Sequence, residues 1–327
     1  MPNAKVVFLT GLPQRTVDVI LSHNPDGFET QVVRRDASVD EQKQAVADAD
    51  FIIVYGAELA DDVLRAGPKV RVVQTLAAGY DRMNHGLMAD LDVACCNNGG
   101  ANSWAVADHT VLLMLAVYRK LIAVDLSTRE GRWNEPITGA NTFEMAEKMV
   151  GVLGIGNIGR QVAKRVQGFD SKTQYYDLYP LPEETERELN LSRVELDELF
   201  ATSDVVTCHI PLTPQTRHVV SRERIAMMKP TSIVVNTSRG PVVDEAALID
   251  ALREGQIAGA GLDVFEQEPV DPNNPLLKME NVIATPHTAG TTWNTWPRRA
   301  GFAYRNLKGV WEGEPPMGVA RDFDIQG

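Results

Sequence analysis

The chain has 327 residues, of which 44% are hydrophobic and 23% charged, an ordinary composition for a globular protein long enough for two domains. Its 32 basic and 44 acidic residues give a net charge of −12, which argues against nucleic acid and anionic membranes as partners. Three cysteines, Cys95, Cys96 and Cys208, have the spacing of neither a disulfide framework nor a zinc site, and no apolar run approaches the roughly 20 residues that span a bilayer. We therefore expect reduced thiols, no metal and a cytoplasmic location.

Predicted strands and helices alternate along the chain. Short apolar, β-branched runs predict strands at Val6–Leu9, Phe51–Val54, Val70–Gln74, Val150–Gly154, Thr173–Tyr176, Val205–His209, Ile233–Asn236, Ala258–Leu262 and Val282–Ala284. Helical patterns cover Asp40–Ala49, Ser103–Arg129, Asn157–Gly168, Leu196–Ala201 and Asp244–Arg253. This alternation predicts parallel sheets with helices on both faces.

The position of a glycine-rich signature divides the predicted elements into two sets. The signature begins near residue 150, and about five strand–helix units follow it, whereas the first hundred residues hold strands of their own. We therefore predict two doubly wound α/β domains. A Rossmann domain of residues 102–288 is inserted into a flavodoxin-like domain of residues 1–101 and 289–327, to which a last helix at Thr291–Trp311 returns.

The glycine-rich signature reads G-x-G-x-x-G and lies between a predicted strand and a predicted helix. Gly154 permits a tight turn, Gly156 lets the backbone approach a pyrophosphate, and Gly159 lets the helix pack closely on the strand. The helix N-terminus offers free N–H groups to the phosphates, so the predicted loop also includes Asn157 and Ile158. A tight turn without a ligand and an S-adenosylmethionine site are the alternatives.

An acidic residue follows at the end of the next predicted strand. Asp177 is placed to accept hydrogen bonds from ribose hydroxyls, and no arginine lies close behind it to hold a 2′-phosphate. The predicted cofactor is therefore NAD rather than NADP.

Three further polar residues each follow a predicted strand of the same domain: Arg239, Glu268 and His287. Taken singly, Arg239 would be a surface charge, Glu268 a solvated loop carboxylate and His287 a core imidazole with its hydrogen bonds made. Because the carboxyl ends of parallel strands meet at one edge of a sheet, we expect the three side chains to converge there.

In this order, the glycine loop with its aspartate, N-x-S-R-G, D-V-F-E-x-E-P and T-P-H-x-A-G resemble the D-isomer-specific 2-hydroxyacid dehydrogenases over nearly the whole chain. The resemblance implies an NAD-dependent oxidoreductase that moves a hydride between NAD(H) and a small anionic D-2-hydroxy or 2-oxo acid. It implies that Arg239 binds the substrate carboxylate, that His287 is the acid–base group and that Glu268 hydrogen-bonds to His287.

The resemblance also implies the remaining contacts of the ligands. LAAGYD resembles the substrate-carboxylate loop, in which the backbone N–H groups of Ala78 and Gly79 hold one oxygen, and Asp263 takes the nicotinamide carboxamide. The other predicted cofactor contacts are His209, Pro211, Thr216, Thr237, Ser238, His287, Ala289 and Gly290, and the loop adds Leu76 and Ala77 to the predicted substrate contacts. The positions of three further residues make them candidates for the substrate pocket: Tyr55 at the end of a predicted strand, and Trp293 and Trp296 about one helical turn apart shortly after His287. The two tryptophans have an alternative role in packing the last helix.

The resemblance finally implies a homodimer. The stretch of residues 97–115 resembles the family's hinge and dimer helix, on which we expect His109 to pack at an interface, and Trp133 resembles the family's arm toward a partner subunit. Two alternative functions share the Arg–Glu–His set: a phosphite-type dehydrogenase and an NAD(H)-sensing, corepressor-like binding protein. Formate dehydrogenases fit poorly, because they carry glutamine where Glu268 stands.

Overall fold

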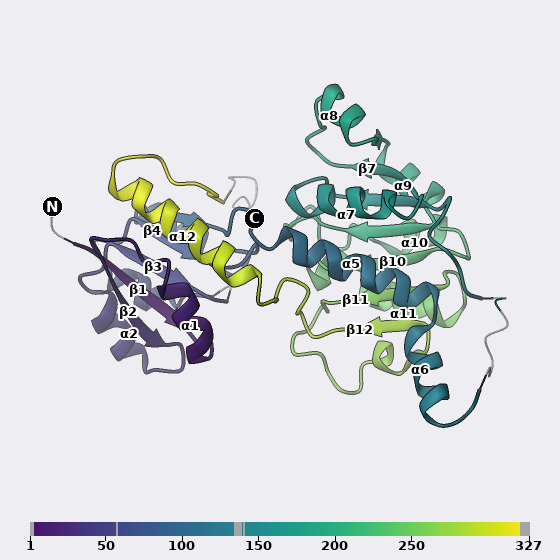
Figure 1. Cartoon of the computed structure of the whole chain (residues 1–327), viewed down its shortest axis with the longest axis horizontal. Coiled ribbons are helices and arrows are strands. Elements are labelled where there is room, and N and C mark those ends of the chain that lie inside the picture. The colour runs from purple at the N-terminus through teal and green to yellow at the C-terminus, as the bar shows by residue number, and fades with distance from the viewer. Residues whose placement is uncertain (1–2, 57, 134–138, 140, 321–327) are drawn as a thin grey trace. The chain divides into compact units, whose positions relative to one another are not determined.

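The computed structural model describes residues 3–56, 58–133, 139 and 141–320. The described residues form two compact units (Figure 1). The terminal unit comprises Met1–Asn102 with Thr291–Gly327, and the central unit comprises Ser103–Gly290. Within the described residues, no helix combines the length and the apolar character that crossing a membrane requires.

The terminal unit is built on a five-stranded sheet in which all strands are parallel. Its order is β2-β1-β3-β4-β5, the flavodoxin-like doubly wound order. The strands are β1 Ala4–Thr10, β2 Phe28–Arg34, β3 Phe51–Val54, β4 Val72–Thr75 and β5 Ala94–Cys96. The helices are α1 Gln14–Leu21, α2 Val39–Val46, α3 Asp61–Arg65, α4 His85–Asp90 and α12 Thr295–Trp311.

Strand β1 shows why these strands are apolar without alternation. Val6 and Phe8 pack in one buried cluster with α1 and α12, whereas Val7 and Leu9 pack in another with α2, α3 and α4. Because helices cover both faces of the sheet, both sets of side chains are buried.

The central unit is built on a seven-stranded parallel sheet with the order β12-β11-β10-β9-β6-β7-β8, a Rossmann arrangement. The strands are β6 Met149–Leu153, β7 Lys172–Tyr176, β8 Ser192–Arg193, β9 Val205–Cys208, β10 Ile233–Asn236, β11 Gly259–Leu262 and β12 Val282–Ala284. The helices are α5 Ser103–Tyr118, α6 Leu121–Arg129, α7 Asn157–Gln167, α8 Glu183–Glu188, α9 Leu196–Thr202, α10 Arg222–Met227, α11 Glu245–Arg253 and the 3-10 helices η1 Gly240–Val242 and η2 Pro275–Lys278.

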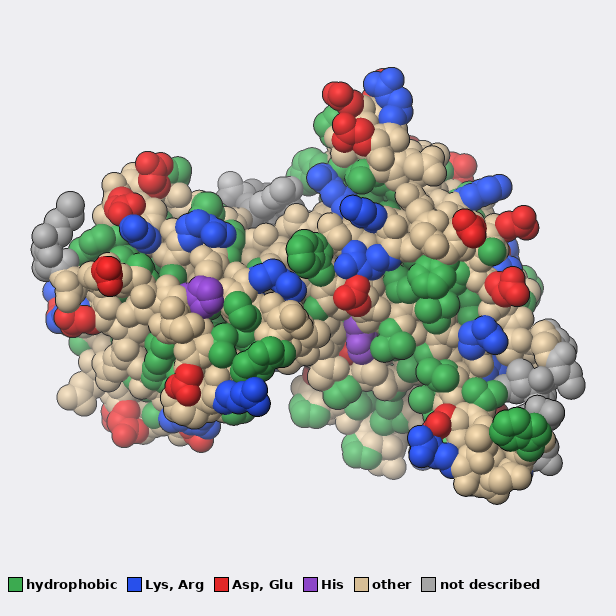
Figure 2. Space-filling model, viewed as in Figure 1, with side chains coloured by type: hydrophobic (Ala, Val, Ile, Leu, Met, Phe, Trp, Pro, Cys, Tyr) green, Lys and Arg blue, Asp and Glu red, His purple; other side chains and the backbone are tan. Residues whose placement is uncertain are grey.

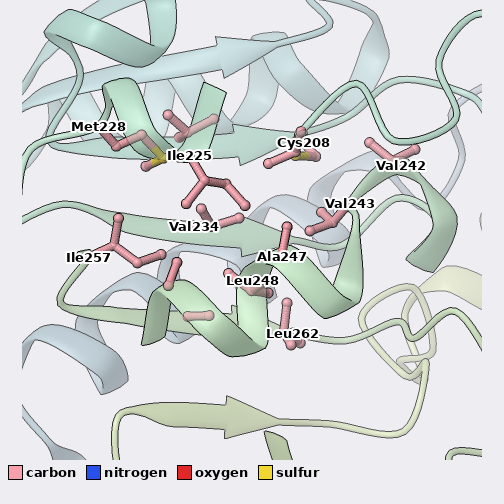
Figure 3. Close-up of a cluster of buried hydrophobic side chains, with 14 of the residues drawn as sticks. Cys208, Ile225, Met228, Val234, Val242, Val243, Ala247, Leu248, Ile257 and Leu262 are labelled. Carbon is pink, nitrogen blue, oxygen red and sulfur yellow. The ribbon is translucent and has the colours of Figure 1, made fainter. Parts of the chain in front are cut away.

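Two buried clusters fix the helices on this second sheet. Helices α5 and α7 pack on one face, and α9, α10 and α11 pack on the other. Figure 3 shows the second cluster, where Ile225 of α10 and Leu248 of α11 lie against Val234 of β10. The predicted fold, two parallel α/β domains with a Rossmann and a flavodoxin-like sheet, is thus confirmed.

The structure differs from the predicted elements in one broken helix, one helix start and several missed elements. The single helix predicted over Ser103–Arg129 is wrong, because Lys120 takes a left-handed conformation with φ 49 and separates α5 from α6. The last helix begins at Thr295 rather than Thr291. The prediction also missed the helices α1, α3, α4 and α10 and three strands. Among these strands, β2 is partly exposed and polar, β5 has three residues and β8 has two exposed ones.

Candidate active site

The glycine loop follows β6 and leads into α7, and its three glycines meet different constraints. Gly154 has φ +95, and a Cβ there would lie 2.8 Å from the carbonyl oxygen of His209. A Cβ on Gly159 would lie 2.1 Å from the carbonyl oxygen of Gly154, so only glycine lets the helix approach the turn. A Cβ on Gly156 would meet nothing within 4 Å. The backbone at the start of α7 is therefore open to a phosphate group.

Asp177 follows β7 and is anchored against this loop. Its Oδ2 accepts a hydrogen bond from the backbone N–H of Ile155 at 2.8 Å, and its Oδ1 accepts one from that of Tyr179 at 3.0 Å. A carboxylate oxygen can accept more than one hydrogen bond, so this geometry fits the predicted contact with ribose hydroxyls.

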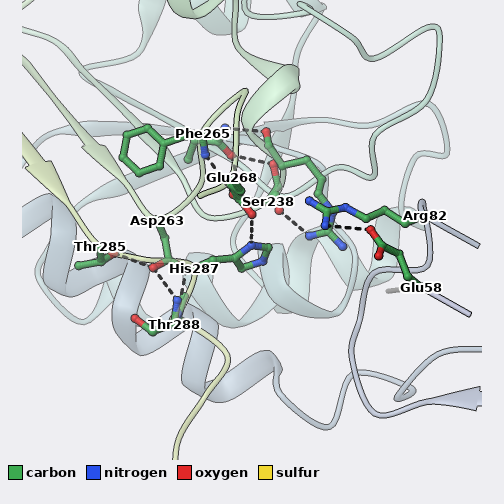
Figure 4. Close-up of polar contacts among 12 residues, drawn as sticks. Glu58, Arg82, Ser238, Asp263, Phe265, Glu268, Thr285, His287 and Thr288 are labelled. Carbon is green, nitrogen blue, oxygen red and sulfur yellow. Dashed lines mark hydrogen bonds and ion pairs between the residues drawn. The ribbon is translucent and has the colours of Figure 1, made fainter. Parts of the chain in front are cut away.

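His287 and Glu268 form the central polar pair of the site (Figure 4). The Nδ1 of His287 lies 2.8 Å from Oε2 of Glu268, and the other carboxylate oxygen accepts the backbone N–H of Phe265 at 3.1 Å. The imidazole is 47% exposed, whereas the carboxylate side chain is 22% exposed. With Nδ1–H donating to the carboxylate, Nε2 is the nitrogen left to exchange a proton with a substrate.

The electrostatics of Glu268 favour the charged form. Its partial burial opposes ionisation, but the hydrogen bond and charge of His287, the backbone N–H of Phe265 and the charge of Arg239 outweigh burial and lower the pKa of Glu268. The carboxylate is therefore ionised whenever the pH exceeds the ordinary range for a glutamate.

The backbone of His287 has φ 55, an uncommon conformation for a residue with a side chain. Its N–H donates to the carbonyl oxygen of Asp263 at 2.7 Å. The carboxylate of Asp263, 1% exposed, accepts the Thr285 hydroxyl at 2.6 Å and the N–H groups of Thr288 and Ala289 at 2.9 and 2.8 Å (Figure 4). Asp263 thus holds the loop that presents the imidazole. Its predicted contact with the nicotinamide carboxamide stays a prediction.

Arg239 follows β10 in a turn that Asn236 organises. The amide of Asn236 donates to the carbonyl oxygen of Arg239 at 2.8 Å, and its Oδ1 accepts from the N–H and hydroxyl of Ser238 at 3.0 and 2.8 Å. A Cβ on Gly240 would lie 1.8 Å from the carbonyl oxygen of Phe265, so glycine is required where this turn meets the Glu268 loop. The three side chains predicted to converge come from loops that contact one another.

Helix α5 contacts two of these loops through neighbouring residues. Nε2 of His109 lies 2.9 Å from the Thr285 hydroxyl, and the buried Thr110 hydroxyl lies 2.9 Å from that of Thr237. The structure places His109 in the Asp263 network, and its predicted position at an interface stays a prediction. Sequence reasoning also missed Asn236 and Thr110. The adjacent polar pair in the apolar stretch ADHTVLLML was the available signal.

The other predicted cofactor residues lie on the loops after β9, β10 and β12. His209 is partly buried, its Nε2 lies 2.9 Å from the Thr207 hydroxyl, and desolvation lowers its pKa to about 3, so it is neutral. The Thr216 hydroxyl donates to the carbonyl oxygen of Pro211 at 2.7 Å and shapes that loop. Among the described residues, no group of three or more His, Cys, Asp or Glu could hold a metal ion.

Apart from Arg239, the predicted substrate residues belong to the terminal unit. The ring of Tyr55 lies 5.0 Å from that of Trp296, which is 5% exposed, whereas Trp293 is 48% exposed and lies under the guanidinium of Arg15. Trp296 is thus part of the helix packing, the alternative role considered for it. In the carboxylate loop, Leu76 is fully buried, and residues 77–79 are partly exposed.

Comparison with known proteins gives a family match and several relatives. Residues 111–289 match the model of the family described as D-isomer specific 2-hydroxyacid dehydrogenase, NAD binding domain. The chain is 39% identical over 285 residues to a glyoxylate reductase of Thermofilum pendens, covering 85% of this chain and 83% of that protein. It is 37% identical over 317 residues to a glyoxylate reductase of Korarchaeum cryptofilum, covering 95% and 94%. A solved structure of a glyoxylate reductase from Paecilomyes thermophila is similar with a TM-score of 0.85 and 25% identity, covering 98% and 99%.

Proposed function

The chain belongs to the D-isomer-specific 2-hydroxyacid dehydrogenase family, and we propose that it reduces a small 2-oxo acid to the D-2-hydroxy acid. In this proposal its own residues bind the substrate and transfer the proton. The predicted family, the enzyme class and the cofactor NAD are confirmed by the family model and the relatives. The glycine loop fits this cofactor, since space is open at Gly156. Bound NADH supplies the hydride.

The observation that carries the proposal is the 2.8 Å contact between His287 and Glu268 beside the Arg239 turn. Arg239 binds the substrate carboxylate with its planar fork and polarises the 2-oxo group. His287 donates a proton from Nε2 to the carbonyl oxygen as the hydride arrives, and takes it back in the reverse direction. Glu268 orients the imidazole and balances its charge.

The proposed cofactor contacts follow the central unit, which we assign as the cofactor domain. Gly154, Gly156 and Gly159 shape the pyrophosphate site, and Asp177 accepts from the ribose hydroxyls and selects NAD over NADP. The proposal includes Asn157, Ile158, His209, Pro211, Thr216, Thr237, Ser238, Asp263, Ala289 and Gly290 as further contacts. We assign the terminal unit as the substrate domain, with substrate contacts from Tyr55, Trp293 and residues 76–79.

The test is a panel of 2-oxo acids (glyoxylate, hydroxypyruvate, pyruvate and phenylpyruvate) with NADH, followed by loss of NADH absorbance. We expect sustained turnover with at least one acid, and a loss of about a hundredfold or more in kcat for His287→Gln. Arg239→Ala should raise KM and also lower kcat. NADH binding without turnover would support the corepressor-like alternative, and reduction of NAD by phosphite would support the phosphite-type alternative.

We further propose a cytoplasmic homodimer with no nucleic acid or membrane partner. Helices α5 and α6 expose Trp104, Leu112, Ile122 and Leu126 by half or more, and Trp133 is 78% exposed. Figure 2 shows hydrophobic side chains over these helices on the face in view. An apolar face of this kind fits a second copy of the chain. The cysteines are free and buried, as a reducing compartment would keep them. A monomer in light scattering at assay concentration would contradict the dimer.

A further inference from the structure

The terminal unit contains a cavity of about 370 Å³, in which Tyr55 is the only described lining residue that is also a predicted substrate contact. Leu9 at the end of β1 and Val54 at the end of β3 line it. These strands are neighbours, but the chain leaves β1 for α1 on one face of the sheet and β3 for α3 on the other. A crevice at such a switch point is where doubly wound sheets bind ligands. Its volume falls within the range of sites for ligands much larger than a two-carbon acid.

Two arginines in this cavity share one carboxylate. Nη2 of Arg35, which follows β2, and Nη1 of Arg82, in the loop after β4, each lie 3.4 Å from a different oxygen of Glu58. Charge-assisted hydrogen bonds of this type are usually about 2.7–2.9 Å long, so both contacts are loose. The side chains of Arg35, Arg82 and Glu58 are 43%, 52% and 57% exposed, respectively. Glu58 can therefore turn into solvent. Each guanidinium carries five N–H donors, more than these contacts use.

The guanidinium of Arg35 lies against the backbone of Gly56. The side-chain amide of Gln42 donates to the carbonyl oxygen of Arg35 at 3.1 Å. A Cβ on Gly56, where φ is +111, would lie 2.1 Å from Nη1 of Arg35, so the guanidinium occupies space that a side chain would fill. The second acidic residue of the cavity, Asp61, accepts the side-chain amide of Asn84 at 2.8 Å. Glu58 is thus the acidic group that bridges the two arginines.

We propose that Arg35 and Arg82 bind an anionic group, a carboxylate or a phosphate, at the far end of a 2-oxo acid substrate. Glu58 holds the two guanidinium groups until this group displaces it. Arg82 lies in the same loop as the predicted carboxylate-binding amides of Ala78 and Gly79, and Tyr55 lines the cavity. This inference rests on the proposed function and assigns its substrate class as 2-oxo acids with a second anionic group.

The test compares 2-oxoglutarate with 2-oxovalerate, which has the same carbon chain without the second carboxylate. We expect the unmodified enzyme to have the lower KM for 2-oxoglutarate. Arg35→Gln and Arg82→Gln should each raise that KM about tenfold, the scale of a hydrogen bond between charged groups, with 2-oxovalerate unchanged. Glu58→Gln should lower the KM for 2-oxoglutarate, because it removes the competing carboxylate. 3-Phosphohydroxypyruvate in parallel distinguishes a phosphate from a carboxylate.

The matched control is Arg34→Gln. Arg34 is adjacent to Arg35, pairs with Asp36 at 3.3 Å and does not line the cavity, so its replacement should leave both KM values unchanged. Equal changes in KM for 2-oxoglutarate and 2-oxovalerate, or KM changes of the same sign for Arg82→Gln and Glu58→Gln, would overturn the inference.

If no 2-oxo acid is reduced, the proposed function fails. Calorimetric binding of 2-oxoglutarate then decides the site: binding that Arg82→Gln abolishes supports it, and no binding overturns it.

Discussion

At the scale of single residues, Glu268 shows how a loop carboxylate acquires a role. Its oxygens are divided between the imidazole of His287 and the backbone N–H of Phe265, so one group both orients the histidine and fixes the loop. A glutamine in this position could keep the shape of these contacts but not the charge. We therefore expect Glu268→Gln to lower kcat about tenfold, less than the roughly 10²–10⁴-fold that a general acid itself contributes.

The matched control for that substitution is Glu266→Gln. Glu266 is two residues earlier and pairs with another histidine, His218, at 2.7 Å, outside the proposed reaction site. Steady-state kinetics of both variants should show a loss in kcat for Glu268→Gln alone. Equal losses would indicate that the loop, rather than the carboxylate beside His287, determines the rate.

The ionisation of Glu268 should also make the free energy of unfolding depend on pH. Its pKa in the folded protein is below the ordinary 4.5, so the folded state binds this proton less readily than the unfolded chain. The resulting stability is present above pH 4.5 and is lost as the pH falls through the folded pKa. In Glu268→Gln, the free energy of unfolding should fall less steeply below pH 4.5, by at most about 1.4 kcal/mol per pH unit. Parallel curves in urea titrations of the two proteins would contradict this.

The charge of Asp177 should determine the preference for NADH over NADPH. Its carboxylate already accepts two backbone N–H groups, which holds its charge beside the glycine loop. That charge should repel a 2′-phosphate, so we expect Asp177→Ala to weaken NADH binding and to reduce the preference for NADH over NADPH. Fluorescence titration with both cofactors measures the two effects. Asp177→Asn keeps one oxygen acceptor and removes the charge, and should reduce the preference with a smaller loss of NADH affinity. Equal affinity of the unmodified protein for both cofactors would remove the basis of this prediction.

At the scale of elements, α5 positions two loops of the proposed site. The Thr110 hydroxyl bonds to Thr237, two residues before Arg239, and also donates to the carbonyl oxygen of Val106 at 2.7 Å. Thr110→Val keeps the side-chain shape and leaves the buried Thr237 hydroxyl without this partner, at a cost of about 1–3 kcal/mol. We expect a lower kcat and a raised KM through displacement of Arg239.

Thr128→Val on α6 is the matched control for Thr110→Val. The Thr128 hydroxyl makes the same contact four residues back, to the carbonyl oxygen of Val124 at 2.8 Å, at an exposed position of the helix. Kinetics and thermal unfolding of both variants separate the roles. A loss of stability in Thr110→Val with unchanged kcat and KM would show that the contact serves folding alone.

Three strands have the bounds that their local sequence predicts. Phe51–Val54, Ile233–Asn236 and Val282–Ala284 were predicted with the bounds that the structure has, because a short apolar run between turn residues is a local signal. Strand β2 was missed because its exposed polar residues hide the pattern, and it forms through pairing with β1. The break between α5 and α6 was missed because a left-handed lysine has no sequence signature.

At the scale of the whole molecule, burial controls the chemistry of the cysteines. Burial raises the pKa of Cys95 and of Cys208 to about 12 and that of Cys96 to about 11, so the reactive thiolate is scarce at neutral pH. We expect the native protein to resist alkylation by iodoacetamide, and all three thiols to react once it is unfolded. Mass spectrometry counts the modified sites. Rapid labelling of any thiol under native conditions would contradict the packing described for it.

The sequence by itself determined the alternation of strands and helices, the family and the placement of Arg239, Glu268 and His287 after predicted strands, because apolar periodicity and turn residues are properties of neighbouring positions. Only the tertiary structure decided that Asp263 holds the His287 loop, that His109 and Thr110 reach the loops of the site, and that Arg35 and Arg82 share Glu58. These contacts join residues far apart in the chain. Their geometry depends on how the strands pair and the helices pack, which no local pattern records.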